Sequence, residues 1–292
     1  MTNVIQKNKT LKFLLSNIDS LAVAFSGGVD STFLLTRAHE VIQDKNKLIA
    51  ITAVSPIHPE TDIKVAEAFV KKIGIRHLII HSTEMDFSEF VANTPERCYV
   101  CKKIIFKQII DVAMAHGIGA VTHGINVDDE KEFRPGMKAA RELNIRSPLL
   151  DAGLTKHDIR MLSKDMGLST WDKPASGCLA TRIPYGETIT LEKLNMIEAS
   201  EVFLAGQGFS HCRVRHYGEM AKIEVPARDL DRLLNPSTRT LIIDALKKVG
   251  FLYVTLDMEG YDSGRLNRSL VSEPDTSNPL TIDANKLTNG IP

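Results

Sequence analysis

The stretch that decides the fold of this chain is Ala24-Phe-Ser-Gly-Gly-Val-Asp-Ser-Thr32. It follows the apolar run 21–25 and leads into an amphipathic run, an order typical of a strand, a glycine turn and a helix. Gly27 and Gly28 allow a ligand to come close to the backbone, and free N–H groups at the start of a helix attract anions. The stretch therefore predicts a phosphate-binding loop in an α/β fold.

The side chains of this loop fit the same interpretation. Ser26 and Ser31 carry hydroxyl donors for phosphate oxygens, and Asp30 can orient donors or hold Mg²⁺. The Walker pattern G-x-x-x-x-G-K-[ST] is absent, so the loop is of another kind. The run S-G-G-x-D-S resembles the pyrophosphatase loop of enzymes that cleave ATP between its α- and β-phosphates and pass AMP to an oxygen. That resemblance implies adenylation of an acyl or carbonyl oxygen; the alternative is a plain glycine turn.

Length and composition are ordinary for a globular protein. The 292 residues suffice for two domains, and 43% of them are hydrophobic and 25% charged. A run of about 18 apolar residues is absent, so we expect no membrane span. Because 36 basic residues balance 36 acidic ones, we expect no nucleic-acid partner. The first residues lack an apolar signal core, so we expect a cytoplasmic protein.

Strand and helix patterns alternate along the first part of the chain. Apolar, β-rich runs lie at 21–25, 48–54, 77–81 and 119–123. Helical patterns lie at about 30–42, 60–73, 98–116 and 155–166. This alternation predicts a doubly wound parallel sheet with helices on both faces. Ligand is then expected at the carboxyl ends of the strands, where the Ser26 loop falls.

The pattern of helical and strand segments changes near residues 185–188, where we place a domain boundary. Beyond it, helical patterns lie at about 190–206 and 227–249, and short strands at 211–216, 221–225 and 251–256. We expect a phosphate-loop domain at 1–186, a smaller α/β domain for substrate binding or oligomerisation at 187–267, and a tail at 268–292. The tail is polar and without a period, so we expect it to be mostly disordered.

Four cysteines in an intracellular chain indicate metal binding or sulfur chemistry rather than disulfides. Cys98 and Cys101 form a C-x-x-C at the start of a helical pattern, where the helix N-terminus favours thiolates. Arg97 and Lys102 add to this effect. Cys178 lies in a glycine- and proline-rich loop that could close over the same edge of the sheet. Three such thiolates could hold three irons of a [4Fe–4S] cluster and leave the fourth iron open.

Spacing alone leaves other interpretations of the cysteines open. A structural zinc ion would need a fourth ligand, for which Cys212 is the obvious candidate. Cys212 alternates with its neighbours in an expected strand, which favours a half-buried strand residue. A thioredoxin-type pair would follow the first strand, whereas this C-x-x-C follows the third. An inert buried cysteine is a reasonable interpretation of any one of the three positions, but a poor interpretation of all three together.

Eight motifs between about residues 20 and 265 carry a more specific resemblance. Besides the phosphate loop they are 94–103 (TPERCYVCKK), 124–136 (GINVDDEKEFRPG), 147–150 (SPLL), 175–186 (ASGCLATRIPYG), 213–215 (RVR), 223–226 (IEVP) and 253–257 (YVTLD). In this order they resemble the LarE family of ATP-dependent sulfur insertases, which help to build the nickel-pincer nucleotide cofactor of lactate racemase. The resemblance implies that ATP adenylates a carboxylate of pyridinium-3,5-biscarboxylic acid mononucleotide. Sulfur then displaces AMP and leaves a thiocarboxylate.

Members of this family fall into two kinds. One kind sacrifices the sulfur of a single loop cysteine and retains dehydroalanine; the other carries three cysteines that hold a [4Fe–4S] cluster. With Cys98, Cys101 and Cys178 this chain resembles the second kind. Gly177 stands where single-cysteine relatives have the sacrificial residue, which argues against sacrifice of Cys178. The implied cofactors are ATP, Mg²⁺ and a [4Fe–4S] cluster, and a sulfide donor is an expected partner.

Position and chemistry assign roles around the nucleotide. The residues expected to bind its pyrophosphate are Ser26, Gly27, Gly28, Asp30 and Ser31. Gly124 lies where a strand end would meet the adenine or ribose. Lys102 and Arg182 adjoin the cysteine segments and can neutralise charge as AMP is transferred. Asp129 and Glu130 are candidates to hold Mg²⁺ or orient substrate, unless they form a solvated acidic loop.

The second domain carries a candidate substrate site. Arg213 and Arg215 alternate along one expected strand, so both point to one face, and paired guanidinium groups suit the phosphate of the substrate. A salt-bridged strand face is the alternative. Glu201 and Glu224 are weaker candidates for the same site, and the histidines and the lone Trp171 are expected to be ordinary core or surface residues. Because the resemblance is to oligomeric proteins, we also expect a homo-oligomer.

Three other functions share part of these features. A tRNA 2-thiolation enzyme has the same loop and three cysteines, but typically a lysine in place of Val29 and a more basic surface. NAD or GMP synthetase shares the loop and has no use for three cysteines. A zinc-stabilised ATP-binding module is the non-enzymatic alternative, which zinc without iron or labile sulfide would favour.

Overall fold

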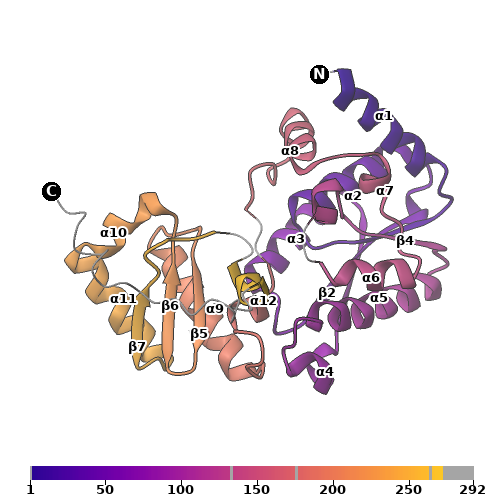
Figure 1. Cartoon of the computed structure of the whole chain (residues 1–292). Helices are drawn as coiled ribbons and strands as arrows, with labels where there is room; N and C mark the ends of the chain where they lie inside the picture. The colour runs from indigo at the N-terminus through magenta and orange to yellow at the C-terminus, as the bar shows by residue number, and fades with distance from the viewer. Residues whose placement is uncertain (1, 132–133, 175–176, 263–264, 272–292) are drawn as a thin grey trace, which may run out of the picture.

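The computed structural model of the chain describes all residues except 1, 132–133, 175–176, 263–264 and 272–292. Its strands form two sheets (Figure 1), of which the first is parallel with the order β3-β2-β1-β4. The strands are β1 (Leu21–Ala24), β2 (Leu48–Val54), β3 (Arg76–His81) and β4 (Ala120–Thr122). The parallel sheet expected from the sequence is confirmed, with each strand close to its expected bounds.

Helices cover both faces of this sheet because its central strands are apolar on both faces. Leu21 and Val23 of β1 pack into one hydrophobic cluster, and Ala22 packs into the other. The first cluster includes α1 (Thr2–Ser16), α2 (Val29–Val41), α3 (Glu60–Ile73), α7 (Pro148–Asp151) and α8 (Lys156–Asp165). The second includes α4 (Ser88–Val91), α5 (Arg97–Ala115) and α6 (Gly136–Glu142). The doubly wound arrangement is therefore present.

The second sheet has the strand order β5-β6-β7. β5 (Arg213–Tyr217) and β6 (Met220–Glu224) are antiparallel, and β7 (Tyr253–Leu256) runs parallel to β6. α9 (Leu191–Gly206), α10 (Leu230–Leu234) and α11 (Pro236–Val249) pack with this sheet in a third cluster. The helical segments expected at about 227–249 are α10 and α11, which are separate because Pro236 lacks the N–H that would continue α10 and instead begins α11.

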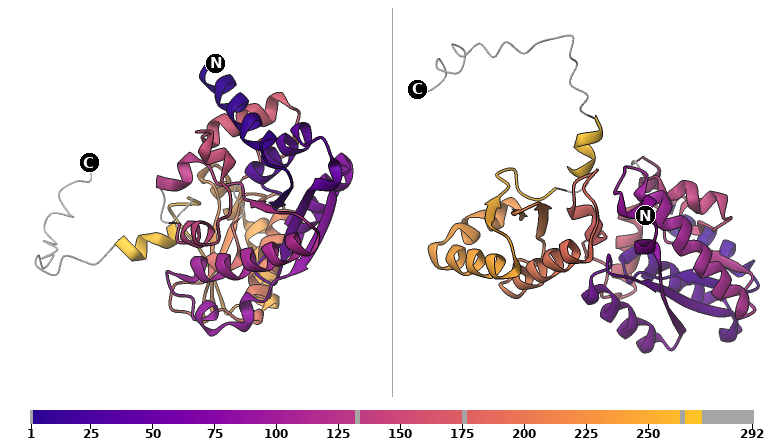
Figure 2. Two further views of the ribbon diagram at one scale, coloured as in Figure 1. Left: turned by 90° about the vertical axis from the view of Figure 1, so that its right-hand side faces the viewer. Right: turned by 90° about the horizontal axis from the view of Figure 1, so that it is seen from below.

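α9 joins the two parts of the molecule. Leu194 and Ile197 near its start pack in the second cluster of the first sheet, whereas Leu204 near its end packs beneath the second sheet. Figure 2 shows the two parts side by side, with α9 at their junction. Apolar contact with the first part thus extends beyond residue 187, the expected start of the second domain.

The last described element is α12 (Arg268–Val271), a short helix at the start of the expected tail. The rest of that tail, 272–292, lies outside the described residues, so the expectation that it is disordered stays a prediction. Within the described part of the chain, no helix has the length and apolar character needed to cross a lipid bilayer.

Candidate active site

The phosphate loop connects β1 to α2, as expected, and its shape depends on glycine. Gly27 has a φ of +67°, a left-handed conformation that other residues rarely adopt, and an added Cβ would lie 3.0 Å from Ala66 Cβ. The hydroxyl oxygens of Ser26 and Ser31 lie 3.2 Å apart across the loop. Ser31 Oγ also donates to Gly28 O at 3.2 Å. Two hydroxyl groups are therefore held together at the start of α2.

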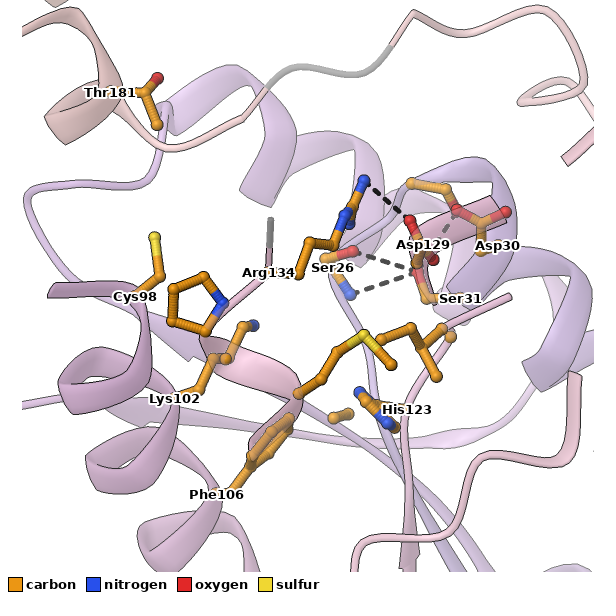
Figure 3. Close-up of a pocket in the computed structure, with 17 residues that line it drawn as sticks. Ser26, Asp30, Ser31, Cys98, Lys102, Phe106, His123, Asp129, Arg134 and Thr181 are labelled. Carbon is orange, nitrogen blue, oxygen red and sulfur yellow. Dashed lines mark hydrogen bonds and ion pairs between the residues drawn. The ribbon is translucent and has the colours of Figure 1, made fainter. Parts of the chain in front are cut away.

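A cavity of about 480 Å³ opens beside this loop, at the carboxyl ends of the strands. Its volume lies in the range of small-molecule sites. Figure 3 shows Cys98 and Lys102 of α5 on the side opposite Ser26 and Ser31. The lining residues are Ala24, Ser26, Gly28, Asp30, Ser31, Cys98, Lys102, Phe106, His123, Gly124, Ile125, Asp129, Arg134, Pro135, Gly136, Met137 and Thr181. The fold thus brings the phosphate loop and the C-x-x-C helix to one cavity.

Gly124 follows β4 and approaches the phosphate loop closely. An added Cβ would lie 2.8 Å from the backbone nitrogen of Ser31 and 3.1 Å from Cβ of Asp30. A larger residue would push the end of β4 away from the first turn of α2. Gly136 has a similar role at the opposite wall, where an added Cβ would lie 2.8 Å from Cγ of Lys102.

The two acidic candidates after β4 separate in the structure. Asp129 is buried, lines the cavity, accepts a hydrogen bond from Asn126 N at 2.9 Å and pairs with Arg134 at 2.7 Å. Burial raises the pKa of Asp129 above its usual value. Glu130 is exposed and lies 3.4 Å from Arg141. Of the pair, Asp129 is the one that faces the cavity.

Of the three candidate cysteines, Cys98 lines this cavity, and Cys101 and Cys178 meet in the hydrophobic cluster behind it. Cys98 lines it from the first turn of α5, and Cys101 is buried one turn further along. Cys178 immediately precedes the short helix Leu179–Arg182 and packs against the same hydrophobic cluster as Cys101. The loop is fixed there by a hydrogen bond of 2.8 Å from Leu179 N to Ile57 O. The structure therefore brings Cys178 toward the C-x-x-C, as expected.

Burial raises the pKa of two of these thiols, those of Cys98 and Cys101. It raises the pKa of Cys98 above its usual value, and the repulsion of Cys178 adds to the effect, against the opposing influence of Arg97 and Lys102. Burial likewise raises the pKa of Cys101 far above its usual value. Arg97 and Lys102 lower the pKa of Cys98, the direction expected from the sequence, but burial outweighs them and the net shift is upward.

The three cysteines fit an iron–sulfur cluster by the kind of ligand atom that they offer, not by a coordination geometry already in place. Across the described residues, no group of three or more His, Cys, Asp or Glu side chains is arranged to hold a metal ion. Cys178 nevertheless packs against the hydrophobic cluster that contains Cys101, Cys98 lies one turn before Cys101 on α5, and thiolate sulfur is the ligand that iron–sulfur clusters take. Cys212 is buried in the third cluster, just before β5, and burial raises its pKa to about 12. It is therefore poorly placed to complete a zinc site with the other three.

Arg182 holds in place the loop that contains Cys178 (the cysteine loop). Its guanidinium forms a two-pronged ion pair with Glu201 of α9, with nitrogen–oxygen distances of 2.9 and 3.0 Å. Its Nη1 donates to the carbonyl oxygens of Gly177 and Cys178 at 3.0 and 2.9 Å. Arg182 is 2% exposed and is not among the residues that line the cavity. Its contacts hold the loop in place, and the expected role in AMP transfer stays a prediction.

The second sheet reaches the cavity through Arg215. Arg213 and Arg215 occupy alternate positions of β5, so their side chains share one face. Arg215 pairs with Glu224 at 2.9 Å and donates at 2.9 Å to the carbonyl oxygen of Thr181, which lines the cavity. Arg213 lies over the ring of Tyr261, with its pKa lowered mainly by burial. The two arginines share a face, and the Arg215–Glu224 ion pair is what the alternative of a salt-bridged strand expects. Glu201 is likewise paired, with Arg182. Substrate binding by this face stays a prediction.

Two lysines that the sequence pattern did not single out reach the phosphate loop. Lys156 Nζ, from the first residue of α8, pairs with Asp30 Oδ2. Lys173 Nζ donates to Gly27 O at 3.2 Å and pairs with Asp62 at 3.0 Å. These lysines are 126 and 146 residues from their loop partners, so no local motif marks them.

Comparison with known proteins places this site in a family. A family model described as asparagine synthase matches residues 16–127, which span β1 to β4. Over 273 residues the chain is 34% identical to the pyridinium-3,5-bisthiocarboxylic acid mononucleotide synthase of Lactiplantibacillus plantarum, covering 92% of this chain and 97% of that protein. The chain belongs to the family of this synthase. The resemblance to LarE-type enzymes, which the motifs carried, is confirmed.

Two further relatives mark the extent of the similarity. The uncharacterized protein slr1717 of Synechocystis is 39% identical over 264 residues, covering 90% of this chain and 98% of the relative. The tRNA-specific 2-thiouridylase MnmA of Rickettsia africae is 28% identical over 194 residues, covering 54% of this chain and 52% of that protein. Similarity within the synthase family thus extends over nearly the whole chain, whereas similarity to the thiouridylase extends over about half.

Proposed function

We propose that this enzyme is an ATP-dependent sulfur transferase. It converts a carboxylate of pyridinium-3,5-biscarboxylic acid mononucleotide to a thiocarboxylate, for the nickel-pincer cofactor of lactate racemase. The observation that carries the proposal is the single cavity in which the phosphate loop lies opposite Cys98 and Lys102. One bound substrate can then be adenylated and receive sulfur without leaving the site.

The phosphate loop serves the first step. Its backbone and the hydroxyl groups of Ser26 and Ser31 bind the phosphates, and Asp30 and Asp129 supply oxygen ligands for Mg²⁺. A carboxylate oxygen of the substrate bonds to the α-phosphorus of ATP, and the bond to the bridging oxygen breaks to release pyrophosphate. Lys102 on the opposite wall stabilises the negative charge of the adenylate.

The cysteines serve the second step. Sulfide attacks the acyl carbon of the adenylate, the bond to the AMP oxygen breaks, and the thiocarboxylate remains. Cys98, Cys101 and Cys178 would hold a [4Fe–4S] cluster, which when bound offers an open iron to sulfide. Burial raises the pKa of Cys98 and Cys101, which favours the protonated thiols, so binding of iron to their sulfur atoms would release these protons.

The second sheet supplies substrate binding in this proposal. Arg213 and Arg215 bind the phosphate of the mononucleotide. The hydrogen bond from Arg215 to the carbonyl oxygen of Thr181 joins this arginine pair to the cavity wall. The expected homo-oligomer is part of the same proposal, and light scattering at micromolar concentration tests it.

The function is tested by product analysis with the full chain, Mg·ATP, sulfide and the biscarboxylate mononucleotide. We expect AMP and thiocarboxylate to form together, and neither to form without the mononucleotide. Ser31→Ala should abolish both, since it removes a hydroxyl from the phosphate site. Thiolation of unmodified tRNA with no reaction of the mononucleotide would instead assign the enzyme to the 2-thiouridylases.

The three-cysteine site is tested by anaerobic purification of single cysteine variants. We predict that replacement of Cys98, Cys101 or Cys178 by Ala causes a similar loss of iron and labile sulfide, because three thiolates are needed to hold the cluster. Cys212→Ala is the matched control and should retain both. Stoichiometric zinc without iron in the unaltered chain would contradict the iron–sulfur assignment.

A further inference from the structure

The phosphate loop itself supplies no cationic side chain to balance the negative charge of the phosphates. Residues 24–32 contain no lysine, arginine or histidine, and their one charged side chain is the carboxylate of Asp30. Walker loops carry a lysine that reaches the phosphates, whereas this loop does not. Pyrophosphate leaves with several negative charges, so cationic side chains from elsewhere in the chain would stabilise it there in addition to Mg²⁺.

Lys156 is held beside the loop by a rigid frame. It is the first residue of α8, whose start is fixed by a capping box between Thr155 and Asp158. Lys7 of α1 pairs with Asp158 at 2.7 Å, and the backbone nitrogen of Lys156 donates to Asp128 at 2.8 Å. From this frame the Lys156 side chain extends to the Asp30 carboxylate. Its ammonium group has three donors, so it can serve a second anion.

Lys173 approaches the loop from another direction. It precedes the cysteine loop, and its backbone oxygen accepts a hydrogen bond of 2.7 Å from Arg160 of α8. Its ammonium group donates to the carbonyl oxygen of Gly27 at 3.2 Å and pairs with Asp62 at 3.0 Å. The side chain is 21% exposed, so the ion pair is largely shielded from water. Two ammonium groups from outside the motif therefore contact the loop.

We propose that Lys156 and Lys173 form a two-ammonium seat for the pyrophosphate leaving group. This inference rests on the proposed function in taking pyrophosphate as the group that leaves. In the structure, the Asp30 carboxylate binds Lys156 and the Gly27 carbonyl oxygen accepts a hydrogen bond from Lys173. When ATP binds, its β- and γ-phosphate oxygens replace these partners, and Asp30 becomes available to Mg²⁺. The bond from the α-phosphorus to the bridging oxygen then breaks, and the electron pair stays on pyrophosphate, where the ammonium groups stabilise it.

The seat is tested by calorimetric titration of the full chain with two probes, inorganic pyrophosphate and AMP. We expect Lys156→Met and Lys173→Met each to weaken pyrophosphate binding by about tenfold, the effect of a charge-assisted hydrogen bond of about 1.4 kcal/mol. AMP binding should stay within about twofold, since the seat takes no part in it. Lys156→Arg should retain more affinity for pyrophosphate than Lys156→Met. Lys164→Met is the matched control, because Lys164 also lies on α8 and its ammonium contacts the ring of Trp171.

Asp30→Asn provides a signature that a structural role would not give. Without Mg²⁺ we expect it to strengthen pyrophosphate binding, because it frees Lys156 and removes a repelling charge, and we expect a smaller gain when Lys156→Met is also present. Unchanged pyrophosphate affinity in either lysine variant, or an equal loss of AMP affinity, would overturn the seat. Neither probe needs the sulfur acceptor, so failure of sulfur insertion and failure of the seat give different results.

Discussion

His123 is held in its neutral form by its surroundings. Its Nε2 lies 2.9 Å from Ser147 Oγ, and its ring meets the ring of Phe106 edge-on, with centroids 5.3 Å apart. Burial, with a contribution from Lys102, lowers its pKa from 6.5 to about 3. Below pH 6.5 the unfolded chain therefore binds a proton that the folded chain does not. The stability linked to His123 is complete above pH 6.5 and is lost as the pH falls toward 3.

We predict that His123→Gln makes the free energy of unfolding less dependent on pH between 6.5 and 3. The slope that one such proton contributes is at most about 1.4 kcal/mol per pH unit. Denaturant titrations at several pH values measure this slope, and His157→Gln, at an exposed histidine, is the control that should retain it. If His123→Gln and the unaltered chain show the same slope, His123 ionises freely in the folded state and the assignment is wrong.

Among the structural elements, the loop before Leu179–Arg182 depends on α9 through one ion pair. We predict that Arg182→Met lowers the free energy of unfolding by about 3 kcal/mol, because Glu201 is left largely buried without its cation. Adding Glu201→Leu should restore much of the loss. Thermal and denaturant unfolding of the single and double variants measure both effects. Loss of AMP formation with unchanged stability would show instead that Arg182 acts on the nucleotide.

The elements and the phosphate loop could be predicted from the sequence because their signals are local. The apolar run of β1, Gly27 and the amphipathic start of α2 are contiguous, and each strand carries its own apolar run. Lys156 and Lys173 could not be found this way, because their loop contacts depend on how α8 and the following segment pack. The raised pKa of Cys98 could not be predicted for a related reason, since burial is a property of the packed fold rather than of the C-x-x-C.

At the scale of the whole molecule, α9 connects the second sheet to the part that contains the cavity. Its start packs with the first sheet, its end packs beneath the second, and Glu201 between them holds Arg182. Arg215 adds a direct bond from β5 to Thr181 on the cavity wall. The proposed phosphate site on the second sheet is thereby connected to the cavity where adenylation is proposed.

The measurement that tests the central claim most directly is the amount of thiocarboxylate formed per chain, with the mass of the chain determined before and after. With reconstituted enzyme, Mg·ATP, the biscarboxylate mononucleotide and excess sulfide, we predict more than one thiocarboxylate per chain, an equal amount of AMP, and unchanged mass at Cys178. Product that stops at one per chain, together with dehydroalanine at Cys178, would show that the cysteine itself is the sulfur donor and would contradict the account.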